Sequence, residues 1–128
     1  MTTKGTPDPL APLLDTLNDL LDATEANIAR ARLVKQRIAH IRRQVADGRS
    51  LTDIVAAEPR PLIVELITEN IEALQAAGSQ LRWAEASALR AEGLTATAIA
   101  RLFGVTRQRV SKLLQHPPAS ARSSPSTT

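Results

Sequence analysis

Between Pro12 and Gly48 the chain contains neither proline nor glycine, and this uninterrupted stretch constrains the fold more than any other feature. Proline and glycine are the residues that most often end helices, so their absence predicts one long helix over residues 10–46. It should begin near Asp8 and stop at Asp47 and Gly48. At 1.5 Å per residue such a helix is about 55 Å long. A small globular core does not explain that length.

A largely aliphatic seam runs along this predicted helix. Its residues are spaced alternately four and three positions apart, a period typical of coiled coils. We therefore expect residues 10–47 to be a dimerisation helix. Its predicted interface residues are Leu13, Leu17, Leu20, Asn27, Val34, Ile38, Ile41 and Val45. A second stripe consists of Leu10, Leu14, Leu21 and Ile28. A long helix packed within its own chain remains the alternative.

Charge is segregated along the same stretch. Residues 10–25 carry four acidic side chains and no basic one, whereas residues 30–43 carry six basic side chains and no acidic one. A parallel pair would set like charges side by side, and an antiparallel pair crossing near Asn27 would set acids beside bases. Each exposed pair contributes only about 0–1 kcal/mol, but several act in one direction. We therefore expect a homodimer through residues 10–46 in the antiparallel orientation, with a parallel dimer as the rival.

The next segment, residues 48–60, predicts a short helix and a linker. Ser50 stands three residues before Asp53, which is typical of a helix cap. Proline disfavours helix at the residue before it, so Pro59 should interrupt this helix soon after Ala57.

The domain expected after the linker covers residues 61–115. An apolar stripe at helical spacing predicts a helix from Pro61 to about Ala77. Gly78 should end it, because glycine is the usual residue just after a helix. A further helix is expected over residues 80–92, with Gly93 as its stop.

Two short amphipathic stretches fill residues 95–114. Thr95 and Thr106 stand where each stretch begins, and a threonine hydroxyl can accept an orphan backbone N–H there. Gly104 lies between them, at a position where a helix C-cap requires a positive φ. The inward positions are Ile99, Ala100, Phe103, Val105, Val110, Leu113 and Leu114. This is the layout of a helix-turn-helix, which makes the predicted fold all-α: a long N-terminal helix and a small helical domain that ends in this motif.

The outer face of the second short helix is polar and basic. A helix of this kind presents its outward side chains to base edges in the major groove of duplex DNA. The predicted base-contacting residues are Arg107, Gln108, Ser111 and Lys112, and the predicted phosphate-contacting residues are Thr95, Arg101, Thr106 and Arg109. An ordinary helical hairpin with basic exposed residues is the plainer alternative.

Composition excludes several functional classes. The chain has no cysteine and two histidines, and no cluster of metal ligands, phosphate-binding loop or nucleophile–base set can be assembled. We therefore predict no enzyme, no cofactor and no metal. No apolar run approaches a membrane span and no signal-peptide pattern is present, which predicts a soluble cytoplasmic protein. Residues 1–9 and 116–128 are polar and rich in proline, serine or threonine, which predicts disorder.

Residues 103–110, FGVTRQRV, resemble the recognition motif in region four of bacterial primary sigma factors. That resemblance implies that the positions of Arg107, Gln108, Ser111 and Lys112 face the major groove. Of these, only Arg107 keeps the residue of that family. The wider stretch from Arg60 is similar to small actinobacterial helix-turn-helix proteins, which implies DNA binding.

These observations favour a dimeric protein that binds double-stranded DNA in the nucleoid, as a transcriptional regulator or a nucleoid-associated protein. The alternative is an interaction module that contacts RNA polymerase or another regulator without binding DNA. The two differ in whether the protein binds bare duplex in a salt-dependent way.

Overall fold

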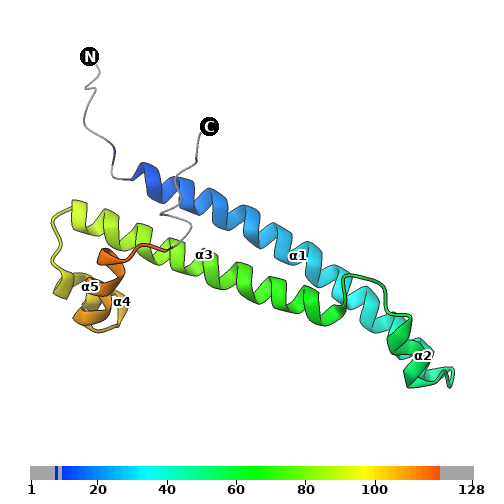
Figure 1. Cartoon of the computed structure of the whole chain (residues 1–128). Helices are drawn as coiled ribbons and strands as arrows, with labels where there is room; N and C mark the ends of the chain where they lie inside the picture. The colour runs from blue at the N-terminus through cyan, green and yellow to red at the C-terminus, as the bar shows by residue number, and fades with distance from the viewer. Residues whose placement is uncertain (1–7, 9, 119–128) are drawn as a thin grey trace, which may run out of the picture. The chain divides into compact units, whose positions relative to one another are not determined.

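The computed structural model describes Asp8 and residues 10–118, and all regular structure in this part of the chain is helical (Figure 1). The helices are α1 (Ala11–Ala46), α2 (Leu51–Ala56), α3 (Ile63–Ala91), α4 (Ala96–Phe103) and α5 (Arg107–Gln115). The predicted all-α class, with a long N-terminal helix and a C-terminal helix-turn-helix, is confirmed. None of these helices is long and apolar enough to cross a membrane. The predictions of disorder for residues 1–9 and 116–128 concern positions that lie almost wholly outside the described residues.

The described residues divide into two compact units. One unit covers residues 22–74 and therefore contains the second part of α1, all of α2 and the first part of α3. The other contains the chain up to Leu21 and from Gln75 onward, which includes the end of α3 with α4 and α5. A cluster of buried residues lies in this second unit and consists of Ala86, Ile99, Ala100 and Val110.

Within the 22–74 unit, α1 and α3 are joined by a pair of asparagines. Asn27 Nδ2 donates to the backbone carbonyl of Asn70 at 3.3 Å, and Asn70 Nδ2 donates to that of Asn27 at 3.2 Å. Arg30 Nη1 donates to both side-chain amide oxygens, at 3.1 and 3.2 Å. The Asn27 side chain satisfies its polar atoms in this way, which allows it to be buried with 8% of its surface exposed.

A second arginine shows how the two helices run. Arg37 Nη1 donates to the carbonyl of Pro59 at 3.0 Å and to that of Pro61 at 2.6 Å. From Asn27 to Arg37 the residue numbers on α1 rise, while those of the residues they contact fall from Asn70 to Pro61 and Pro59. The two helices therefore form an antiparallel hairpin in this unit. In residues 22–74, α1 is therefore packed against a helix of its own chain, which was the alternative to a dimerisation helix.

This arrangement corrects the role predicted for Asn27. We expected Asn27 at the crossing of two copies, but its side chain is buried against α3 of the same chain. The predicted seam in fact straddles two faces of α1. Its half-buried members are Leu13, Leu20, Val34 and Ile41, and its exposed members are Leu17, Ile38 and Val45. α1 therefore carries apolar side chains on more than one face, and the dimer interface itself stays a prediction.

The predicted short helix and linker are present. Gly48 has φ +80° after α1, and Ser50 Oγ accepts the backbone N–H of Asp53 at 3.1 Å at the start of α2. Two carboxylates then hold the first turn of α3. Glu58 accepts from the N–H of Ile63 and Glu65 from that of Leu62, both at 2.7 Å. These bonds satisfy orphan donors that every helix start leaves open.

The predicted break at Gly78 is wrong, because α3 runs without interruption from Ile63 to Ala91. Gly78 is not among the glycines with positive φ, so it has no cap conformation and Ser79 starts no new helix. A glycine inside a helix costs about 1 kcal/mol relative to alanine. Burial of α3 residues on both sides, Leu66 at 3% exposed and Ala84 at 3%, offsets that cost. The predicted stop at Gly93 is correct, with φ +101°.

Candidate nucleic-acid interface

Three helix segments form the small domain that carries the candidate interface. Ile99 and Ala100 of α4 pack with Val110 of α5 and Ala86 of α3, and all four are buried. Ile99 and Ala86 have no exposed surface, and Val110 has 1%. Around this centre lie partly buried apolar side chains: Leu89, Leu94, Ala96, Phe103, Val105, Leu113 and Leu114. The inward face predicted for α4 and α5 is therefore confirmed, and the end of α3 completes its core.

The ends of α4 and α5 are capped as the sequence predicted. Thr95 Oγ1 accepts the N–H of Ala98 and Thr106 Oγ1 accepts that of Arg109, each at 3.1 Å. Gly104 closes α4 in the left-handed conformation at φ +69°, ψ +33°. The turn between the helices is therefore fixed by local hydrogen bonds and one glycine, which holds α5 in a defined direction relative to α4.

Two arginines brace this domain from α3. The guanidinium carbon of Arg82 lies 4.2 Å from the centroid of the Phe103 ring, in cation–π geometry. Arg90 Nη1 donates to the carbonyl of Leu94 at 3.1 Å, across the turn that leads into α4. Neither contact was predicted, because cations and rings far apart in sequence leave no periodic signal.

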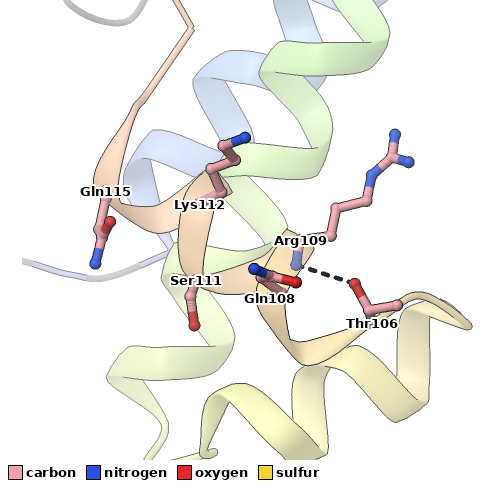
Figure 2. A pocket seen from close by; sticks show the side chains of 6 residues that line it. All are labelled: Thr106, Gln108, Arg109, Ser111, Lys112 and Gln115. Atoms are coloured by element: carbon pink, nitrogen blue, oxygen red, sulfur yellow. Dashed lines mark hydrogen bonds between the residues drawn. The ribbon is translucent and has the colours of Figure 1, made fainter.

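The outer side of α5 is lined by polar and basic side chains (Figure 2). A shallow groove along it is bounded by Thr106, Gln108, Arg109, Ser111, Lys112 and Gln115. Figure 2 shows the side chains of Arg109 and Lys112 extending away from the helix, whereas those of Ser111 and Gln115 point in other directions. Gln108, Arg109 and Lys112 are exposed and Ser111 is half-buried, so a ligand can reach all four.

A second groove follows the other side of α5, where the helix meets the start of α4. Its lining residues are Arg90, Thr95, Ala96, Thr97, Arg107, Ser111, Leu114 and Gln115. Arg107 therefore lies with Thr95, whereas Arg109 lies with Gln108 and Lys112 in the first groove. Ser111 and Gln115 border both grooves.

The structure thus brings together seven of the eight predicted contact residues around α5. The remaining one, Arg101, lies on the exposed surface of α4 and lines neither groove. Arg90, Thr97 and Gln115 line the grooves and were missed. Gln115 follows Ser111 by four residues, so helical spacing alone could have found it. Arg90 and Thr97 come from other helices and give no such signal.

Charge on α5 has a single sign. The helix carries Arg107, Arg109 and Lys112 and no acidic residue. Among the described residues, none of these three cations forms an ion pair with a carboxylate of the protein. Within the same residues, no group of histidine, cysteine or acidic side chains is arranged to hold a metal ion. The exposed face of α5 can therefore attract an anionic ligand by charge and contact it through amide and hydroxyl groups.

Comparison with known proteins agrees with this geometry. Residues 75–115 match the model of the family described as the helix-turn-helix domain of resolvase. The match covers the end of α3, all of α4 and all of α5, the same segments that share the buried core. No curated protein and no solved structure matches the chain. The chain thus contains a helix-turn-helix domain, and this domain type suggests DNA binding.

Proposed function

We propose that this protein reads duplex DNA with α5, with residues 106–114 inserted in the major groove. The observation that carries the proposal is the outer surface of α5, which joins three cations to amide and hydroxyl groups on a helix fixed by a buried core. A helix about 10–12 Å across fits a major groove about 12 Å wide. The match to the resolvase helix-turn-helix domain supports the same mode of binding.

Within this proposal, four residues contact bases. Arg107 can donate two hydrogen bonds to O6 and N7 of guanine, and Gln108 can pair with N6 and N7 of adenine. Ser111 lies between the two grooves, where its hydroxyl can meet either base edge. Lys112 shares a groove with Gln108 and supplies a further donor.

Phosphate contacts surround these residues. Thr95 and Thr106 stand at the first turns of α4 and α5, where backbone N–H groups favour anions. Arg109 extends from α5 beside Lys112 (Figure 2). Arg101 is the most peripheral of the four, because it lines neither groove. Such contacts position the protein on DNA and carry no sequence information.

Two biological roles fit such a protein. A transcriptional regulator would occupy a few sites sharply, and a nucleoid-associated protein would occupy thousands weakly. In either case the protein works in the nucleoid and could also touch the transcription machinery. We further propose that it acts as a homodimer, because two copies of a short recognition helix read a longer site than one copy does.

The proposal is tested by selecting bound duplexes from a random pool. We expect an enriched motif, and with Arg107→Ala a loss of about 1–3 kcal/mol on that motif with relaxed preference at one base pair. Ser87→Ala, a half-buried position on α3 outside both grooves, serves as a control that should leave the motif unchanged. Absence of any duplex binding at low salt would sink the proposal and favour the protein-interaction module.

A further inference from the structure

Exposed apolar side chains gather on both long helices of the 22–74 unit. On α1, Ile28 is 45% exposed and Ile38 is 44%. On α3 the exposed fractions are 64% for Val64, 44% for Ile67, 51% for Ile71 and 51% for Leu74. The four on α3 follow one another at helical spacing and form a row, whereas the two on α1 lie ten residues apart. Isolated exposed apolar residues are common on protein surfaces, but a row of four is not.

Each of these residues follows a buried or half-buried position by one step. Ile28 comes directly after Asn27, and Ile71 comes directly after Asn70, the two residues that face each other between the helices. One residue advances about 100° around a helix. Because the two helices are antiparallel, these rotations run in opposite senses when viewed down the hairpin, so both sets face the same side. We call this side the apolar face; it consists of Ile28, Ile38, Val64, Ile67, Ile71 and Leu74.

The opposite side of the same hairpin is polar. The residues one step before the buried positions include Ala26 on α1 and Glu65 and Glu69 on α3, all of them exposed. Glu69 pairs there with Arg30 at 3.3 Å, and Glu65 pairs with Arg60 at 2.9 Å. On α3 the hairpin therefore has one charged side and one apolar side, whereas on α1 the apolar side also carries Lys35 and Arg42, each one step after a half-buried residue. A helix with one apolar side packs a further layer on that side.

We propose that a second copy of this chain covers the apolar face, so that the two hairpins form a four-helix bundle. In the arrangement we infer, a two-fold axis passes beside Ile28, and α1 of each copy runs antiparallel to α1 of the other. Ile28 then meets its own counterpart. On α3, Ile67 meets Ile71 of the other copy and Val64 meets Leu74, so aliphatic side chains face one another along this helix.

Charge complementarity selects this occupant and this orientation. Glu25 and Arg32 flank the apolar face on α1, and both are exposed. With Ile28 on the axis, Ala31 of the other copy lies level with Glu25, so Arg32 of that copy lies one residue, about 1.5 Å along the helix, beyond Glu25 and can pair with it; the symmetry makes this pair twice. In the rival arrangement, with α1 above α3 of the second copy, Arg32 would lie level with Glu65, which already pairs with Arg60 on the charged side, and Glu25 would lie level with the acidic Glu72. The antiparallel homodimer thus keeps its orientation, but its interface differs from the seam predicted from the sequence.

The proposal concerns assembly and stands apart from DNA binding, so each can fail alone. Its test uses the full chain, which has no natural cysteine. Ile28→Cys should oxidise to a disulfide-linked dimer in most of the sample. Ala26→Cys is the matched control, because it is exposed on the same helix and lies on the polar side; it should stay monomeric on denaturing gels. A mixture of Ile67→Cys and Ile71→Cys chains should cross-link more than either variant by itself.

The unmodified chain should sediment as a dimer, with twice the 13.8 kDa mass of one chain. Ile71→Glu should convert it to a monomer that keeps its helical circular dichroism, since this side chain is exposed within one chain. Arg32→Glu should weaken the dimer, and adding Glu25→Arg to it should restore the affinity. A monomer at all concentrations would overturn the proposal, and so would a dimer in which Ile28→Cys and Ala26→Cys cross-link equally.

Discussion

The helix-turn-helix and the 22–74 hairpin are both helical, but their contacts are specified over different distances along the chain. In the helix-turn-helix, Thr95, Gly104 and Thr106 close the helix ends through residues no more than a few positions away. In the hairpin, Asn27 bonds to a residue 43 positions distant. The comparison shows which features can be predicted from a sequence. Helix caps can be recognised from residues a few positions apart, whereas the segment that packs against a long helix cannot.

The largest effect is expected in the core of the helix-turn-helix. Ile99→Ala should lower the free energy of unfolding by about 2–5 kcal/mol, because this side chain has no exposed surface and its loss leaves a cavity. Leu102→Ala on the same helix is the control, since Leu102 is 66% exposed and should change stability little. Urea denaturation measures both. Similar losses for the two variants would show that α4 is rotated from the position described.

The asparagine pair tests the hairpin in the same way. Asn27→Ala should cost about 1–3 kcal/mol, because it removes a partner of Arg30 from a buried site. Asn18→Ala, an exposed asparagine of α1, should have almost no effect. A double-mutant cycle of Arg30→Ala with Asn70→Ala should give a coupling energy of about 0.5–3 kcal/mol, because Arg30 Nη1 donates to Asn70 Oδ1 across the hairpin. Additive single effects would mean that the side chains of Arg30 and Asn70 do not meet within one chain.

Two glycines should respond with opposite signs to the same substitution. Gly78→Ala should stabilise the protein by about 1 kcal/mol, because Gly78 lies inside α3 and an added methyl group meets nothing within 4 Å. Gly104→Ala should instead destabilise it by about 1–2 kcal/mol, since φ +69° disfavours a residue with a Cβ atom. Thermal unfolding of the two variants separates them. A stabilising Gly104→Ala would remove the left-handed cap from this account.

The same contrast explains which parts of the fold could be predicted from the sequence and which could not. The helix-turn-helix core was predicted residue by residue, because Ile99 and Val110 follow helical spacing beside recognisable caps. Ala86 was missed as a core residue, because it is one of several alanines in this part of α3 and nothing in the sequence distinguishes it from the others. Gly78 was taken for a stop because glycine usually is one; only burial along both parts of α3 keeps that helix continuous.

The place of Asn27 in the α1 seam was mispredicted for a different reason. The apolar residues of the seam occupy two adjacent faces, and period alone does not say which of them packs within the chain. Only the bonds of Asn27, Arg30 and Arg37 to the linker and α3 decide this. Most of the groove-lining residues between 106 and 115 were predicted from the sequence, because they lie on one short helix. Arg90 and Thr97 were not, since folding alone brings them beside α5.

The central claim is that α5 carries the DNA-binding surface, and the salt dependence of duplex binding tests it most directly. Binding of one duplex is titrated over a range of salt concentrations for the unmodified chain, Arg109→Ala, Lys112→Ala and Arg43→Ala. Arg43 is exposed on α1, so Arg43→Ala removes the same charge at a position far from α5 in sequence. We predict that Arg109→Ala reduces the steepness of the salt slope by about 1 and weakens all duplexes alike, as loss of a phosphate contact does. Lys112→Ala should also weaken binding, and Arg43→Ala should leave both slope and affinity unchanged. Equal slopes for all four proteins, or the largest change with Arg43→Ala, would contradict the account.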